Sequence, residues 1–170
     1  MKIETERLII RSYKESDKEE ALLYLGDEET MYFLPEDVFA LDKVSEFIEK
    51  QKEKEEYFAV ELKETNQVIG HLYFAAFFGE HSYEIGWVFN KNYHSKGYGY
   101  EAAKAIMSYG FDKLTIHRII ATCQPENHGS YKVMEKLGMR REGSFKKCIP
   151  VKDGWWDEYY YAILSSEWRC

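Results

Sequence analysis

The chain contains little cysteine and proline, and it has no long apolar segment. Three cysteines and three prolines occur among its 170 residues. Cys123, Cys148 and Cys170 are odd in number and form no CxxC pair, which favours free thiols in a reducing compartment over a disulfide framework. No run approaches the length of a membrane-spanning helix, and the first residues include no apolar signal core. These absences predict a cytoplasmic protein without a membrane partner.

Metal-binding patterns and basic clusters are also scarce. The five histidines are scattered without an HExxH arrangement, so we expect no metal site. The formal net charge is -7, whereas nucleic-acid binding needs clusters of Lys and Arg that neutralise phosphates. We therefore expect no nucleic-acid partner. The acidity is compatible with a cationic substrate and equally with a charged surface that keeps the protein in solution.

What the chain does contain is typical of a globular domain. Hydrophobic residues make up 45% and aromatic residues 16% of the sequence, and no linker divides it, so we expect a single domain over residues 1–170. The hydrophobic patterns predict a mixed α+β order around one sheet. Helices are expected from Ser16 onward, over 41–54, after a glycine turn near 97, and over 128–137. Strands are expected over residues 3–13, 57–62, 68–78, 82–89, 118–123, 139–147 and 155–164.

The most informative segment is the glycine turn within residues 93–103. It lies between a strand-like run that alternates in hydrophobicity and an amphipathic helix. Gly97 and Gly99 allow backbone N–H groups to converge ahead of that helix, where they and the helix dipole favour an anion. Both a phosphate-binding loop and an ordinary tight turn fit this pattern.

Three residues outside the turn add to the pattern. Gly86 lies inside a strand, where glycine often marks a bulge or the close approach of a ligand. Asn127 and Ser130 begin the helix that follows the next strand. Taken alone, Asn127 predicts a helix N-cap and Ser130 an ordinary first-turn residue.

Several motifs in order resemble the GNAT N-acetyltransferases. These motifs are Glu-Ile-Gly-Trp-Val at 84–88, His-Ser-Lys-Gly-Tyr-Gly-Tyr-Glu-Ala at 94–102, Pro-Glu-Asn-x-x-Ser at 125–130 and Glu-Lys-Leu-Gly at 135–138. The segments 5–11, 142–143 and 153–157 resemble the ribosomal-protein N-terminal acetyltransferase (RimJ/RimL-like) branch. The resemblance covers essentially the whole chain. It implies the GNAT fold, a central mixed sheet of about seven strands flanked by about four helices.

The resemblance also implies acetyl-CoA as cosubstrate, with no metal. In the family, the glycine loop binds the coenzyme A pyrophosphate through main-chain N–H groups, and the preceding strand pairs with the pantetheine arm. Here Trp87 and Val88 take the strand role, Asn127 matches the asparagine that contacts the arm, and His94 departs from the family's Gln or Arg. The loop amides are those of Ser95, Lys96, Gly97, Tyr98, Gly99 and Tyr100.

The catalytic groups follow from the same resemblance. Ser130 matches a serine proposed as the acid that protonates the leaving thiolate, because Met134 stands where many relatives have tyrosine. The Val88 amide, on a bulge near Gly86, is expected to stabilise the oxyanion. We assign Glu84 as the general base, since it shares a strand face with Gly86. Glu84 is a substitute, because Cys148 and Ile149 stand where RimL-like enzymes have a glutamate. The alternative is that Glu84 is an ordinary strand carboxylate in a salt bridge.

The acceptor is expected to be a primary amine. The leading candidate is a protein N-terminus, and the rival is a small-molecule amine such as a polyamine, amino acid or aminoglycoside-like compound. A non-catalytic coenzyme A sensor and a nucleotide-binding protein are further alternatives, and either a monomer or a homodimer is compatible with the sequence. Candidate acceptor-pocket residues are Tyr32, Phe33, Trp155 and Trp156, with Glu36, Asp37 and Asp157 near them.

Overall fold

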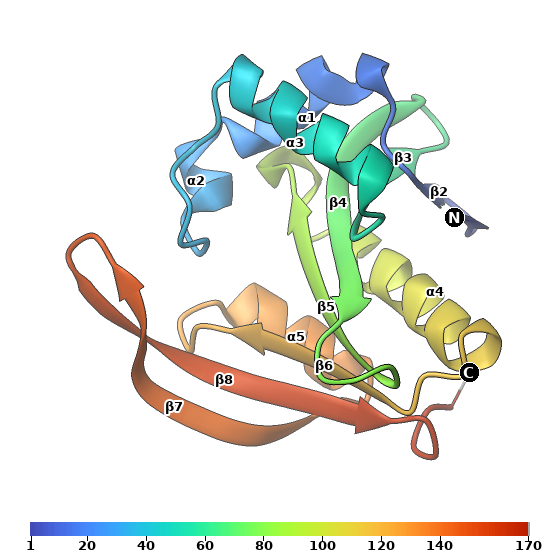
Figure 1. The fold of residues 1–170 in the computed structure, drawn as a ribbon, viewed down its shortest axis with the longest axis vertical. Coiled ribbons are helices and arrows are strands. Elements are labelled where there is room, and N and C mark those ends of the chain that lie inside the picture. Colours follow the sequence, from blue (N-terminus) through green and yellow to red (C-terminus); the bar gives the residue numbers. More distant parts are fainter. Residues whose placement is uncertain (170) are drawn as a thin grey trace.

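The computed structural model describes residues 1–169, so the Cys170 thiol lies outside the described residues. Within them, eight strands form one sheet in the order β1-β2-β3-β4-β5-β6-β8-β7 (Figure 1). Neighbouring strands are antiparallel except β5 and β6, which are parallel. The strands are β1 (Lys2–Glu4), β2 (Leu8–Arg11), β3 (Tyr57–Leu62), β4 (Gln67–Ala76), β5 (Ser82–Phe89), β6 (Arg118–Cys123), β7 (Arg140–Val151) and β8 (Gly154–Leu164).

Helices cover both faces of this sheet. On one face α4 and α5 bury a core that includes Leu72, Ile106 and Ile119, and on the other α1 and α3 bury a second cluster around Tyr24 and Ile48. The α-helices are α1 (Lys18–Leu25), α2 (Glu28–Met31), α3 (Leu41–Glu53), α4 (Tyr98–Lys113) and α5 (His128–Lys136), with 3-10 turns η1 (Glu15–Asp17) and η2 (Lys91–Tyr93).

The mixed α/β sheet architecture is confirmed, but the element count is not. The single strand predicted over residues 3–13 is a hairpin of β1 and β2, because Thr5 Oγ1 accepts a hydrogen bond from the Leu8 amide at 2.9 Å and closes a turn. The additional helix α2 begins after Asp27, whose carboxylate accepts from the Thr30 amide at 2.8 Å. Four helical residues are too few to produce a hydrophobic period in the sequence.

The last two strands form a long hairpin that extends beyond the other strands (Figure 1). β7 continues to Val151, past the predicted end at residue 147. Its pairing with β8 shifts between Arg141 and Gly143 and again between Phe145 and Ile149. Irregularities of this kind bend a strand, which is consistent with the curvature of the hairpin.

The feature that prepares a site is the separation of β5 from β6. The two strands pair only through Ser82–Glu84 and Arg118–Ile120, although both continue beyond this segment. The remaining backbone of β5 therefore has an unpaired edge that faces β6.

In the described part of the chain, no helix is long and apolar enough to cross a membrane.

Candidate active site

The loop between β5 and α4 leaves a row of backbone amides free. Gly97, the N-cap of α4, has φ +81°, Ser95 has φ +61°, and no side chain caps the helix. The first amide with a partner is that of Glu101, which donates to Gly97 O at 3.0 Å. Within residues 1–169, the six amides from Ser95 to Tyr100 donate no hydrogen bond. Unbonded amides at the start of a 16-residue helix can bind an anion.

His94 holds this loop against the end of β5. Its Nε2 lies 2.8 Å from Phe89 O, and because a carbonyl oxygen only accepts, Nε2–H is the donor. Asn90 Oδ1 accepts from the Asn92 amide at 3.0 Å in the same turn. The side chain at the position that departs from the family pattern is thus bonded to the strand.

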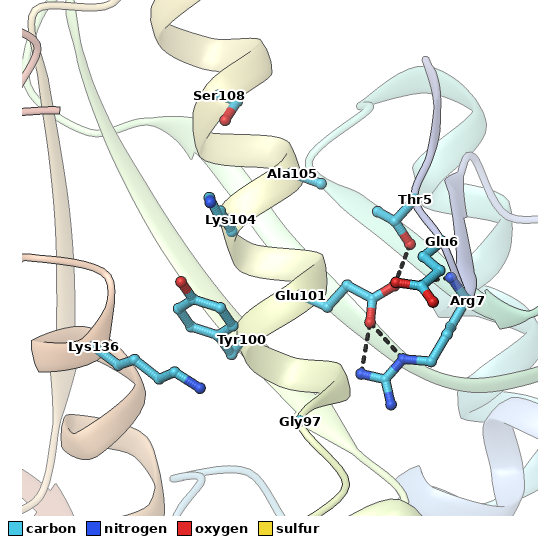
Figure 2. Close-up of a pocket in the computed structure, with 10 residues that line it drawn as sticks. All are labelled: Thr5, Glu6, Arg7, Gly97, Tyr100, Glu101, Lys104, Ala105, Ser108 and Lys136. Carbon is cyan, nitrogen blue, oxygen red and sulfur yellow. Dashed lines mark hydrogen bonds and ion pairs between the residues drawn. The ribbon is translucent and has the colours of Figure 1, made fainter. Parts of the chain in front are cut away.

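A cleft of about 480 Å³ adjoins the loop, between the β1–β2 turn and the outer face of α4 (Figure 2). The Glu101 side chain points from α4 toward Thr5 and Arg7 in the turn. Two lysines, Lys104 and Lys136, also line the cleft, and Lys136 Nζ lies 4.2 Å from the centroid of the Tyr100 ring. The surroundings of the free amides therefore include several cationic groups.

Alternation along β5 decides which backbone groups face the unpaired edge. The Asn90 amide donates to Ile69 O at 2.9 Å, and the Phe77 amide donates to Ser82 O at 2.8 Å. Between these bonds the β4–β5 register is unbroken, so every second residue of β5 bonds to β4. The residues whose backbone groups turn toward β6 are Ile85, Trp87 and Phe89.

This register corrects two expectations. No bulge occurs at Gly86, which pairs with Tyr73 in the regular ladder. The unpaired groups expected from a bulge come instead from the separation of β5 and β6. Val88 pairs with His71, so its amide belongs to the β4 ladder and is not available as an oxyanion donor. The Trp87 amide instead faces the gap between β5 and β6.

Asn127 and Ser130 lie at the start of α5, just past the end of β6. Asn127 Oδ1 accepts from the Ser130 amide at 3.2 Å, so Asn127 is the N-cap that its position predicts. Its Nδ2 group donates no hydrogen bond within residues 1–169 and is free for a ligand. Burial raises the pKa of the Cys123 thiol to about 11, and the neighbouring Ser130 hydroxyl opposes that rise. Ser130 therefore lies beside the last residue of β6.

Glu84 lies where β5 and β6 converge, and Glu158 shares its face of the sheet. Glu84 pairs with Ile120 and Ile120 with Ala162, so Glu158, four residues before Ala162, points to the same side. Burial raises the pKa of Glu84, and the negative charge of Glu158 raises it further. Glu158 was not identified from the sequence. Its two-residue spacing from Tyr160 and Ala162 indicates only that these three residues share one face of β8.

The predicted acceptor-pocket residues are only partly brought together. The Tyr32 and Phe33 rings are in contact, with centroids 4.9 Å apart. Trp155 is 59% exposed and pairs with Pro150 near the hairpin tip. It lies seven residues from Ala162, about 23 Å along the strand from the level of Glu84. Trp156 belongs to the same hairpin end, and Glu36 and Asp37 are exposed.

Asp157 is also occupied by local bonds. Its carboxylate pairs with Lys146 Nζ at 2.8 Å and accepts from the Lys147 amide at 2.8 Å. These contacts stabilise the bend in β7 and lower the pKa of Asp157. Across residues 1–169, no group of three or more His, Cys, Asp or Glu side chains is placed to hold a metal ion.

Comparisons with known proteins point to one family. The family model described as "Acetyltransferase (GNAT) domain" matches residues 7–140. Over 170 residues the chain is 54% identical to the uncharacterized N-acetyltransferase YnaD of Bacillus subtilis (strain 168), covering 99% of this chain and 100% of that protein.

Solved structures agree with this fold. A GNAT-family acetyltransferase from Bacillus anthracis superposes with a TM-score of 0.95 at 53% identity, covering 98% of this chain and 100% of that one. The ribosomal-protein-S5-alanine acetyltransferase from Vibrio fischeri superposes with a TM-score of 0.86 at 23% identity over 100% of both chains. The second likeness is at the level of the fold.

Proposed function

Because this chain belongs to the GNAT acetyltransferase family and is an N-acetyltransferase, we propose that it transfers the acetyl group of acetyl-CoA to a primary amine by direct attack on the thioester. The observation that carries this proposal is the row of unbonded amides from Ser95 to Tyr100, next to the free edge of β5. The pyrophosphate binds these amides, and the pantetheine arm extends along β5 toward Glu84. From Phe89 to Glu84 the strand spans about 16 Å.

The residues along this path have separate roles. Trp87 offers its backbone carbonyl to the arm and its amide to the oxyanion, which develops as the amine nitrogen bonds to the acetyl carbon. Glu84 accepts the proton that the amine loses. Ser130 donates a proton to the sulfur as the carbon–sulfur bond breaks and regains one from solvent, while Glu84 releases the amine proton to solvent. Asn127 Nδ2 contacts the arm. A thiol has a pKa of ~8.5, so the help that Ser130 provides is modest near neutral pH.

We propose a protein N-terminal α-amine as the acceptor. Deprotonating an α-amine of pKa ~7.7–8.0 at pH 7 costs about 1 kcal/mol, whereas a lysine amine of pKa ~10.4 costs about 4.6 kcal/mol. A single partly buried glutamate, Glu84, is therefore a sufficient base for an α-amine, whose deprotonation costs less. The similarity to an S5-alanine acetyltransferase supports this choice at the level of the fold.

A small cationic amine is the second candidate, and the pair of Glu84 and Glu158 favours it. The two carboxylates share one face of the sheet, and the negative charge of Glu158 raises the pKa of Glu84 beyond the effect of burial. A diamine or polyamine supplies a second ammonium group that offsets this repulsion. Such an acceptor does not need the open groove that a peptide requires.

A thiol-release assay with acetyl-CoA tests the function directly. The acceptors are peptides beginning with Ala or Ser, polyamines, amino acids and aminoglycosides, each at several concentrations. Turnover on the peptides supports the N-terminal assignment, and turnover on small amines alone overturns it while retaining the chemistry. If coenzyme A binds in calorimetry and no amine is acetylated, the proposal of an active acetyltransferase fails in favour of a coenzyme A sensor.

Glu84→Gln tests the base. We expect kcat/KM for the best acceptor to fall about a hundredfold, because the neutral amide cannot accept the proton. A base acts when deprotonated, so kcat/KM falls as the pH drops through the pKa of Glu84. Because that pKa is raised, the fall occurs at higher pH than for an ordinary glutamate. Glu158→Gln removes the repelling charge and should move that loss to lower pH. The amine titrates identically in all variants. If Glu84→Gln and Glu158→Gln both keep the wild-type pH profile of kcat/KM, Glu84 is not the base.

A further inference from the structure

Glu101 presents an electrostatic difficulty at the proposed phosphate site. It lies in the first turn of α4, beside the unbonded amides. A carboxylate there stabilises a free helix N-terminus but repels a bound pyrophosphate. Burial favours the neutral form, yet hydrogen bonds from Thr5 and Arg7 hold the pKa of Glu101 below its ordinary value. The side chain is therefore charged at neutral pH.

The β1–β2 turn surrounds this carboxylate with donors (Figure 2). Oε1 accepts from Thr5 Oγ1 at 2.6 Å and from the Arg7 amide at 2.9 Å. Oε2 accepts from Arg7 Nε at 2.6 Å, and Arg7 Nη2 lies 2.6 Å from the same oxygen. Both oxygens of Glu101 are thus occupied by a turn 94 residues away in the chain.

Arg7 also bonds to the loop itself. Its Nη1 donates to Lys96 O at 3.0 Å, and its guanidinium carbon lies 4.5 Å from the centroid of the Tyr98 ring. Each guanidinium nitrogen therefore contacts Glu101 or Lys96. An arginine used in this way orients the loop, because three of its five N–H groups are held by Glu101 and by the Lys96 carbonyl.

We propose that Arg7 is a positioning residue for the coenzyme A phosphates, because it neutralises Glu101 and fixes the Lys96 carbonyl so that the amides from Ser95 to Tyr100 face the ligand. This inference rests on the proposed function, since it concerns the same cosubstrate. With Glu101 neutralised, the other charged side chains that line the cleft are Glu6, Lys104 and Lys136. Without Arg7, an uncompensated carboxylate lies within the first turn of the phosphate-binding helix.

Calorimetric titrations of the full chain test this role with two ligands. Coenzyme A carries the pyrophosphate, and pantetheine has the arm without it. We expect Arg7→Ala to raise the Kd of coenzyme A about tenfold or more and to leave the Kd of pantetheine unchanged. Adding Glu101→Gln to Arg7→Ala removes the repelling charge and should recover most of the lost affinity. Arg140→Ala is the matched control, since it also breaks arginine–glutamate pairs, with Glu142 and Glu167, but these residues belong neither to the loop nor to the cleft.

Two results would overturn the inference. One is an equal loss of affinity for both ligands, which would indicate general damage to the fold. The other is a double variant that binds coenzyme A no better than Arg7→Ala. If Arg7→Ala does not fold, Arg7→Gln removes the charge but keeps a donor for Glu101, and the same two ligands decide. Failure of the wild-type chain to bind coenzyme A would instead reject the proposed function.

Discussion

The two helices that flank the gap between β5 and β6 begin in opposite ways. At α5, Asn127 Oδ1 accepts from the Ser130 amide at 3.2 Å, which is an ordinary N-cap. At α4, Gly97 supplies no side chain, and the six amides before Glu101 donate no hydrogen bond within residues 1–169. Helix-start amides that bond to no protein group are satisfied by water or by a ligand. The difference separates a helix end closed by the protein from one left open for a ligand.

The largest expected effect comes from closing the open end with a negative charge. Gly99→Asp places a carboxylate against the pyrophosphate, and we expect the Kd of coenzyme A to rise about a hundredfold. Gly99→Ala is the control, because its Cβ would meet only the Phe89 ring at 3.6 and 3.8 Å, an ordinary contact. Titration calorimetry measures both. Equal affinities for Gly99→Asp and wild type would reject the phosphate assignment.

Removing the hydroxyl in the first turn of α5 should affect turnover instead of binding. For Ser130→Ala we expect kcat to fall about tenfold, because the departing thiolate is a weak base that solvent also protonates. The Kd of coenzyme A should stay at the wild-type value. Steady-state kinetics and calorimetry on one preparation give both quantities. Weaker coenzyme A binding with normal kcat would show that Ser130 is a contact for the arm.

The smallest effect is expected from opening the capped end. Asn127→Ala removes the oxygen that bonds the Ser130 amide and should cost about 1 kcal/mol of unfolding free energy, lowering Tm by about 2–4 °C. Asn127→Asp keeps an oxygen for the cap but loses the Nδ2 donor. Its Tm should stay near wild type while coenzyme A binding weakens. Wild-type binding by Asn127→Asp would mean that Asn127 serves only as a cap.

Segments with strong local patterns were predicted well. The strands over 57–62, 82–89 and 118–123 match β3, β5 and β6. Alternation indicated the strand over 82–89, whereas the other two are short apolar runs of the kind that form buried strands. The β1–β2 hairpin was missed because its turn, Thr5 to Arg7, carries no glycine or proline. That turn depends on the Thr5 hydroxyl and on Glu101, which lies in another part of the chain.

In the proposed site too, some features follow from local sequence and others only from strand pairing. Alternation places Glu84 and Gly86 on one face of β5 without further information. The pairing of β5 with β4 instead of β6 decides that Val88 is bonded and Trp87 is free, and no local pattern contains that choice. Glu158 reaches the face of Glu84 only through two strand pairings, β5 with β6 and β6 with β8.

By itself the sequence determined the loop at residues 95–100, since Gly97 permits the left-handed backbone, φ +81°, that begins the helix, and Gly99 adds no side chain where the amides converge. Tertiary structure alone decided the charge around that loop. Arg7 and Glu101 meet because β2 packs beside α4, and the strength of an ion pair depends on distance through space. Local conformation is encoded by neighbouring residues, whereas the electrostatics of a site depend on which distant segments the fold brings together.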